Sequence, residues 1–197
     1  MAELRADGQR ALITAGASGI GRAIARALVE AGARVHVCDV DEAALAAFRD
    51  AFPDAGATPV DVADEAAVDR LFTDVAGHLG GLDVLVNNAG IAGPTAAIED
   101  IDPADWRRCL EVGLTGQFLC ARRAVPMLKA AGGGVMVNMS SAAGRLGYAF
   151  RTPYSAAKYG VIGLTESLAK ELGPHGISVN AILPGIVRGP RIDRVIS

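Results

Sequence analysis

Two side chains one helical turn apart suggest acid–base chemistry. Residues 154–158 read YSAAK, so a phenol and an amine stand four positions apart, a spacing that places both on one face of a helix. A free phenol titrates near pH 10, and a neighbouring ammonium favours its ionised form. Tyr154 and Lys158 therefore predict a proton-transferring pair, although chance on an amphipathic helix gives the same spacing.

A serine hydroxyl is expected close to this pair. Ser140 and Ser141 directly follow the apolar run 134–139. At the carboxyl end of a strand, such a hydroxyl can hydrogen-bond a substrate carbonyl or alkoxide. A nucleophilic role is not expected, because none of the 3 histidines belongs to a matching motif and the G-x-S-x-G elbow is absent.

A glycine-rich turn predicts a phosphate site. Residues 14–21 read TAGASGIG, between the first apolar run and a helix-like stretch. Glycines let the backbone approach a diphosphate closely, and a helix N-terminus supplies N–H groups and positive potential. The spacing is not G-x-G-x-x-G, and an ordinary turn between a strand and a helix is the alternative.

An acidic residue follows at the distance that suits a dinucleotide. Asp39 stands 18 positions after Gly21 (39 − 21), where a carboxylate can accept hydrogen bonds from an adenosine ribose. It would also repel a 2′-phosphate, because two charges about 4 Å apart at an effective dielectric of 20 interact by roughly 4 kcal/mol. The sequence therefore favours NAD over NADP. The alternative is that Asp39 only caps a turn.

The elements that must position these groups alternate in type. Short apolar runs alternate with Ala-rich stretches, which predicts a doubly wound parallel α/β sheet (Rossmann-like) in a single domain over 1–197, with ligands at the carboxyl ends of its strands. Strands are expected at Arg10–Thr14, Arg34–Asp39, Thr58–Val62, Asp83–Asn87, Gly134–Met139 and Ile177–Leu183, and helices at about 20–32, 41–51, 65–79, 103–131 and 154–173.

Composition excludes several other classes of protein. The 197 residues are 51% hydrophobic and 21% charged, which excludes a disordered chain, and a net charge of −3 argues against nucleic-acid binding. No run of about 18 uncharged apolar residues predicts a membrane span, and no signal peptide is visible. The 3 cysteines show neither disulfide nor metal-ligand spacing. We therefore expect buried thiols, no metal site and a cytoplasmic location.

Taken in order, these motifs resemble the short-chain dehydrogenase/reductase family. The pattern comprises Thr14–Gly21, Asp61, Asn87–Gly90, Ser141, Tyr154–Lys158 and Pro184-Gly185, and it covers nearly the whole chain. The resemblance implies an oxidoreductase that transfers a hydride between NAD(H) and a secondary alcohol or ketone. It also implies a homo-oligomer, a dimer or tetramer.

The resemblance assigns a role to each matching residue. It implies that Tyr154 is the catalytic acid/base, that Lys158 assists it, and that Ser141, 13 positions before Tyr154, orients the reacting oxygen. The implied cofactor contacts are Thr14, Gly16, Ser18, Gly19, Ile20, Gly21, Asp39, Asp61, Val62, Asn88, Ala89, Gly90, Tyr154, Lys158, Pro184 and Gly185.

Three positions depart from the family pattern. Ala15 replaces a motif glycine, Gly113 stands where the family usually has a catalytic asparagine, and Gly189 replaces a threonine. A glycine at 113 is also expected to loosen the helix 103–131. The chain ends at Ser197, where the family continues through a substrate-covering segment, a helix and a last strand, so that strand is expected to be missing.

Two other activities stay open at this point. One is a dinucleotide-binding module with weak or lost catalysis, which Gly113 and Gly189 motivate. The other is an NADPH-dependent 3-oxoacyl-type reductase, which Asp39 opposes.

The substrate and the assembly are less clearly encoded. In the segment 142–153, a solvated surface role is favoured for Arg145 and Arg151 over attraction of an anionic substrate. Helices 103–131 and 154–173 are expected to form a two-fold interface, because apolar residues such as Val161 and Ile162 exceed what one sheet face needs.

Overall fold

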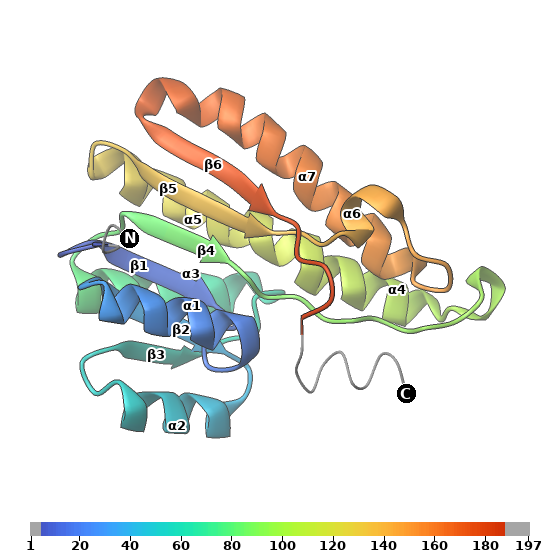
Figure 1. The fold of residues 1–197 in the computed structure, drawn as a ribbon, viewed down its shortest axis with the longest axis horizontal. Coiled ribbons are helices and arrows are strands. Elements are labelled where there is room, and N and C mark those ends of the chain that lie inside the picture. The colour runs from blue at the N-terminus through green and yellow to red at the C-terminus, as the bar shows by residue number, and fades with distance from the viewer. Residues whose placement is uncertain (1–4, 188–197) are drawn as a thin grey trace.

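The computed structural model describes residues 5–187. Six strands form one parallel sheet in the order β3-β2-β1-β4-β5-β6 (Figure 1). The strand order reverses between β1 and β4, so ligand-binding residues are expected at the carboxyl ends of these strands. The strands are β1 (Arg10–Thr14), β2 (Arg34–Asp39), β3 (Gly56–Pro59), β4 (Val84–Asn87), β5 (Gly134–Met139) and β6 (Ile177–Ile182).

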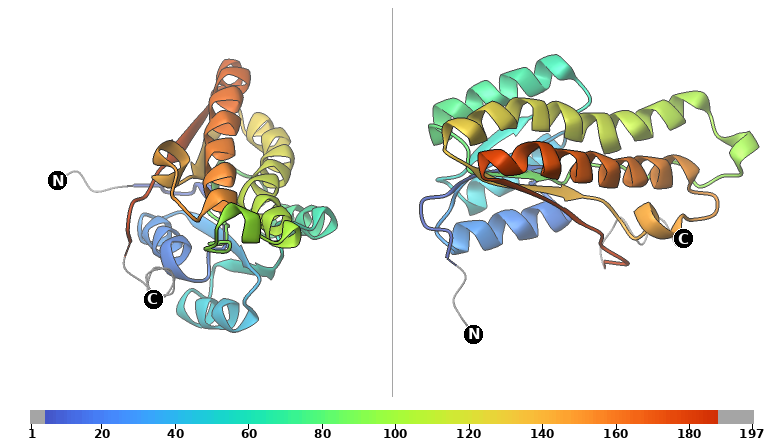
Figure 2. Two further views of the ribbon diagram at one scale, coloured as in Figure 1. Left: turned by 90° about the vertical axis from the view of Figure 1, so that its right-hand side faces the viewer. Right: turned by 90° about the horizontal axis from the view of Figure 1, so that it is seen from above.

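Helices cover both faces of the sheet, which confirms the expected doubly wound parallel α/β fold. Helices α1 and α2 lie on one face, and α3, α5 and α7 lie on the other (Figure 2). The α-helices are α1 (Gly19–Glu30), α2 (Glu42–Ala51), α3 (Glu65–Leu79), α4 (Pro103–Leu110), α5 (Gly116–Ala130), α6 (Ala143–Leu146) and α7 (Thr152–Leu172). The shorter turns are η1 (Ile98–Asp100), the π-helical η2 (Glu111–Thr115) and η3 (Gly173–His175).

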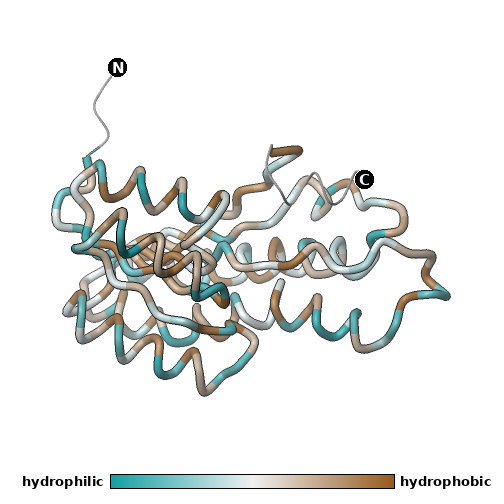
Figure 3. The backbone as a smooth tube through the Cα atoms, turned by 90° about the horizontal axis from the view of Figure 1, so that it is seen from below, coloured by the Kyte–Doolittle hydropathy of each residue, from teal (hydrophilic) through white to brown (hydrophobic). Residues whose placement is uncertain are grey.

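Capping residues mark where several helices begin, and hydrophobic residues determine which faces are buried. Each of α2, α3 and α4 begins after an aspartate whose carboxylate accepts backbone N–H groups of the first turn, namely Asp41, Asp64 and Asp102. Hydrophobic residues gather in the interior, and the outer helices alternate between hydrophobic and hydrophilic residues (Figure 3). The core therefore has two apolar layers, one on each side of the sheet.

The third strand lies earlier than the sequence predicts. The expectation was Thr58–Val62, but β3 ends at Pro59. Val60 and Val62 are buried all the same, in the core on the α3 side of the sheet. Their burial in the loop after the strand explains why an apolar run was read as a strand.

The helix expected over 103–131 is not continuous. Helices α4 and α5 flank the π-helical turn η2, and Gly113 lies at its centre. Glycine stabilises an α-helix poorly, and a π turn inserts one extra residue into the helical repeat. The helix type therefore changes at Gly113, whereas the expected loosening of the helix stays a prediction.

Three further observations concern residues 5–187. No helix in this range has the length and apolarity that a membrane span requires. Cys38, Cys109 and Cys120 are buried and are not joined in disulfides, as expected. No group of three or more His, Cys, Asp and Glu side chains in the described range is placed to hold a metal ion.

A buried histidine gives the fold a dependence on pH. His36 of β2 is 3% exposed, its Nε2 lies 2.9 Å from the Thr58 hydroxyl, and its ring centre lies 5.4 Å from that of His78. Burial lowers the pKa of His36 to about 4; the charges of His78 and Arg49 add to this shift, and that of Asp74 opposes it. The folded state therefore keeps His36 neutral where an unfolded chain binds a proton.

We predict that the free energy of unfolding falls as the pH drops from about 6.5 to about 4. Only the unfolded state takes up a proton at residue 36 in this window, which costs about 1.4 kcal/mol per pH unit, or roughly 3 kcal/mol in all. Urea unfolding of wild type and His36→Gln at several pH values checks this. The pH slope should flatten in His36→Gln and stay unchanged when the exposed His175 is replaced by Gln. An unchanged slope in His36→Gln would contradict the prediction.

Candidate functional site

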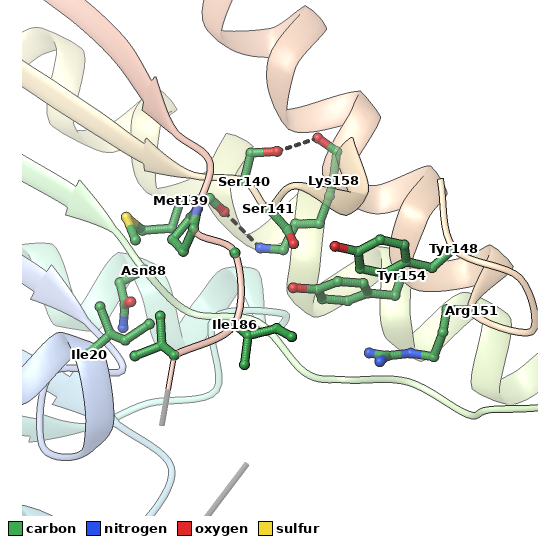
Figure 4. Close-up of a pocket in the computed structure, with 13 residues that line it drawn as sticks. Ile20, Asn88, Met139, Ser140, Ser141, Tyr148, Arg151, Tyr154, Lys158 and Ile186 are labelled. Carbon is green, nitrogen blue, oxygen red and sulfur yellow. Dashed lines mark hydrogen bonds between the residues drawn. The ribbon is translucent and has the colours of Figure 1, made fainter. Parts of the chain in front are cut away.

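A pocket opens at the carboxyl ends of the strands, where the sequence places its candidate residues. Ile20 and Asn88 lie at one end of it, and Tyr154 and Arg151 lie at the other (Figure 4). The described lining residues are Ile20, Asn88, Met139, Ser140, Ser141, Tyr148, Arg151, Tyr154, Lys158, Pro184, Gly185, Ile186 and Val187. Seven of the predicted site residues therefore meet in one cavity.

The predicted proton-transferring pair is held on α7. Lys158 is 3% exposed, and its Nζ donates to the main-chain carbonyl of Met139 at 2.7 Å. The same Nζ lies 5.8 Å from the centre of the Tyr154 ring. Burying an ammonium is costly unless it is hydrogen-bonded. The end of β5 therefore fixes the cation one turn from the phenol.

The two serines after β5 have different roles in the structure. The hydroxyl of Ser140 donates to the carbonyl of Lys158 at 2.7 Å and ties the strand to α7. The oxygen of Ser141 accepts from the backbone N–H of Ala143 at 3.2 Å and points into the same space as the hydroxyls of Tyr148 and Tyr154 (Figure 4). The hydroxyl of Ser141 therefore faces the pocket, whereas that of Ser140 is used in a bond to α7.

The turn between β1 and α1 depends on glycine. A Cβ at Gly21 would lie 2.1 Å from the Ala15 carbonyl oxygen, and one at Gly16 would lie 2.6 Å from a Val37 methyl group. Gly19 has φ +52° with open space at its Cβ position. Ser18 makes no side-chain cap at the start of α1, so the first N–H groups of the helix have no side-chain partner there. A diphosphate fits such a turn.

Ala15 is the departure in this turn. It adopts φ +48°, in the left-handed region that favours glycine. An alanine there costs about 1 kcal/mol relative to glycine. The turn keeps its shape because Asn88 donates its side-chain amide to the carbonyls of both Thr14 and Ala15 at 3.0 Å.

The two candidate carboxylates have different surroundings. Asp39, at the end of β2, is 7% exposed and accepts from the backbone N–H groups of Ala17 and Asp41, each at 3.3 Å. Asp61 accepts from Arg108 of α4 at 2.7 Å. Asp39 thus lies directly beside the glycine-rich turn, whereas Asp61 lies against α4. The side chain of Val62, also a predicted cofactor contact, is 4% exposed and packs in the core.

The segment after β4 mainly holds the sheet end together. The Thr14 hydroxyl accepts from the N–H groups of Asn88 and Ala89, each at 2.9 Å. A Cβ at Gly90 would lie 3.2 Å from Lys158 Nζ, so the small residue leaves room for the ammonium. Pro184 accepts from the backbone N–H of Ala142 at 3.0 Å, which brings the loop after β6 to the pocket. Gly189 lies outside the described residues.

A buried amide behind the pocket was missed in the sequence. Gln117 of α5 is 1% exposed, and its Nε2 donates to the Met139 carbonyl at 3.2 Å and to the Gly113 carbonyl at 3.4 Å. The Met139 carbonyl therefore accepts from both Gln117 and Lys158. No side-chain pattern identifies Met139, because the group that matters is its main-chain oxygen.

Further amides join the strands beneath this carbonyl. Asn87 donates to Asn138 at 2.9 Å, and Asn138 donates to Thr165 of α7 at 3.0 Å. These bonds connect β4, β5 and α7 in the interior. These bonds link the sheet end to the helix that carries Tyr154, although Asn87 Oδ1 itself accepts no hydrogen bond.

Comparison with known sequences identifies the family of the chain. Residues 9–195 match the family model described as short chain dehydrogenase. The cis-4-hydroxycyclohexanecarboxylate dehydrogenase of Sinomonas cyclohexanicum is 46% identical over 185 residues, covering 92% of this chain and 74% of that protein. The 2-dehydro-3-deoxy-L-rhamnonate dehydrogenase (NAD(+)) of a Sphingomonas species is 37% identical, covering 97% of this chain and 77% of that protein.

A solved structure agrees with this assignment. The crystal structure of levodione reductase superimposes with a TM-score of 0.91 at 36% sequence identity, covering 98% of this chain and 77% of that chain. The similarity thus extends over nearly all of the chain at the level of both sequence and fold.

We predict that Gly21→Ala destabilises the fold. Its methyl group would overlap the Ala15 carbonyl, and overpacking of this kind costs typically about 1–3 kcal/mol. Gly77 of α3 is the matched control, because nothing lies within 4 Å of its Cβ position. Gly77→Ala should raise the free energy of unfolding by about 0.5–1 kcal/mol. Denaturant unfolding measures both, and a Gly21→Ala variant as stable as wild type would contradict the geometry of the turn.

Proposed function

The chain belongs to the short-chain dehydrogenases, and from that membership we propose that it transfers a hydride between NAD(H) and the carbon of a secondary alcohol or ketone. The buried Lys158, held on the Met139 carbonyl one helical turn from Tyr154, is the observation that carries the proposal. The names of the relatives support the reaction class. They differ in carbon skeleton and therefore do not fix the substrate.

NAD would bind along the carboxyl ends of the strands. The turn over residues 14–21 would hold the diphosphate, and Asp39 would hold the adenosine ribose. Asp61, Val62 and residues 88–90 would flank the adenosine half. Lys158 and the loop at Pro184 and Gly185 would lie beside the nicotinamide half. The relative named for NAD(+) supports the choice of cofactor, as does the carboxylate of Asp39, which opposes a 2′-phosphate.

The side chains of the pocket supply the proton chemistry. In the oxidation, the phenol oxygen of Tyr154 takes the hydroxyl proton of the substrate, and Ser141 donates a hydrogen bond that orients the reacting oxygen. The Lys158 ammonium, one helical turn from the phenol, supplies positive charge beside the reacting groups. In the reverse direction Tyr154 protonates the carbonyl oxygen. When bound, NAD accepts the hydride that leaves the substrate carbon.

Gly113 lies where we expect the proton taken up by Tyr154 to pass from Lys158 toward solvent. A glycine there has no side chain to participate, but its main-chain carbonyl lies in the π-helical turn and faces the Gln117 amide. Gln117 also donates to the carbonyl that holds Lys158. We propose that main-chain oxygens and Gln117 take the role that the family resemblance assigns to an asparagine side chain at this position.

Assembly and location remain predictions of the sequence. Val161 and Ile162 are buried within the chain itself, so they are not available for the two-fold interface expected of these helices. The exposed aromatic residues on these helices are Phe118 of α5 and Tyr159 of α7, at 47% and 46% exposure. A homo-oligomer that pairs these helices in a cytoplasmic enzyme is the arrangement we propose.

We predict that Tyr154→Phe lowers turnover of secondary alcohols with NAD by at least about 100-fold, because general acid–base groups contribute 10²–10⁴-fold, while NADH binding is kept. Absorbance of NADH over a panel of alcohols measures this. Tyr159→Phe, which removes an exposed phenol from the same helix, should behave as wild type. Equal, near-zero turnover of wild type and Tyr154→Phe, with NADH still bound, would instead favour a dinucleotide-binding module.

We predict that Asp39→Ala lowers the preference for NADH over NADPH by at least about tenfold, because it removes the charge that repels a 2′-phosphate. Fluorescence titration with each dinucleotide gives the ratio of the two dissociation constants. Asp41→Ala is the control, since it removes an exposed carboxylate two positions away. A wild-type preference for NADPH would contradict the assignment of Asp39 and favour a 3-oxoacyl-type reductase.

A further inference from the structure

The wall of the pocket beside Tyr154 carries a cation. The described residues that line the pocket include Arg151 and Lys158 but no carboxylate. The chain as a whole has a net charge of −3, so the positive lining is local. Lys158 is already held on the Met139 carbonyl. Arg151 therefore sets the charge of the part of the pocket that lies farthest from Ile20 and the glycine-rich turn (Figure 4).

The guanidinium of Arg151 has a hydrogen-bond donor without an acceptor among the described residues. Its Nη2 donates to the Ala92 carbonyl at 2.8 Å, and its Cζ lies over the Tyr154 ring, 4.7 Å from the ring centre. Its Nε is buried and has no hydrogen-bond partner. No carboxylate of residues 5–187 forms an ion pair with it. By contrast, Arg145 pairs with Glu166 at 3.4 Å on the exposed surface.

The position of Arg151 in the chain is also unfavourable without an anion. It is the residue immediately before α7, where short polar or acidic side chains are preferred, and it makes no side-chain cap. A cation at a helix N-terminus faces the positive end of the helix dipole. A negatively charged ligand group would satisfy both the guanidinium and the start of α7.

We propose that Arg151 binds a carboxylate of the substrate, so that the alcohols and ketones turned over are hydroxy and oxo acids. This inference rests on the proposed function. The guanidinium carbon lies 4.7 Å from the centre of the ring whose hydroxyl meets the reacting oxygen, and one small skeleton can span both groups. In the oxidation, the hydroxyl proton goes to Tyr154, the hydride goes from carbon to NAD, and the carboxylate stays unchanged on Arg151.

Two merely structural roles for Arg151 need to be separated from this one. Through its bond to Ala92, it would brace the loop after β4. Through its position over the ring, it would hold the Tyr154 side chain in place by a cation–π contact. Either role would affect charged and uncharged substrates equally, whereas carboxylate recognition affects only the charged ones. The discriminating readout is therefore a difference between two matched ligands.

The test uses cyclohexanecarboxylate and its neutral counterpart cyclohexanecarboxamide as probes that lack a hydroxyl group and cannot react. Binding to wild type, Arg151→Gln, Arg151→Lys and Arg145→Gln is measured by calorimetry, with and without NADH. We expect wild type and Arg145→Gln to bind the carboxylate roughly 10- to 100-fold more tightly than the carboxamide. Arg151→Gln should lose this preference, and Arg151→Lys should keep part of it.

The outcomes separate this inference from the proposed function. A wild type that shows no preference for the carboxylate, or an Arg151→Gln variant that keeps the full preference, overturns the inference. If Arg151→Gln fails to fold, the carboxylate-to-carboxamide preference of the wild type and of Arg151→Lys still tests the inference. Arg151→Lys keeps the charge but loses the two parallel N–H donors. Tyr154→Phe should keep the carboxylate preference while it loses turnover, so a failure of the reaction and a failure of Arg151 give different results.

Discussion

A buried ammonium on a main-chain oxygen is the constraint on which the site depends. Lys158 is 3% exposed and its ammonium donates to the Met139 carbonyl at 2.7 Å, and a buried charge is stable only where it is hydrogen-bonded. The bond therefore fixes the rotation of α7 relative to the end of β5. Tyr154 follows from this, since it lies one turn along the same helix, and Gln117 strengthens the anchor by donating to the same oxygen.

Small residues make this close packing possible. Gly144 lets α6 approach α7, because a Cβ there would lie 2.7 Å from the Lys158 carbonyl oxygen. Gly90 leaves space for the Lys158 ammonium, and Gly21 lets α1 begin against the Ala15 carbonyl. Each of these glycines lies where a side chain would crowd a neighbouring element at the ligand-binding edge.

The sequence predicts those features that depend on the type of a side chain or on the spacing of hydrophobic residues. The strand and helix alternation, the face shared by Tyr154 and Lys158, and the buried cysteines are all of this kind. Contacts of the main chain are not, which is why the sequence does not predict the role of the Met139 carbonyl. Arg151 also reads as a surface residue in a polar loop, and only the fold turns it toward Tyr154. Likewise, burial of Val60 and Val62 in a loop mimics a strand.

The most direct test of this account is a crystal structure of the complex with NADH. The account predicts that the Lys158 ammonium stays within about 3 Å of the Met139 carbonyl while it also contacts the nicotinamide ribose. The nicotinamide ring should lie between Ile20 and Tyr154. A cofactor bound elsewhere, or a Lys158 side chain turned away from both the ribose and the Met139 carbonyl, would contradict the central claim.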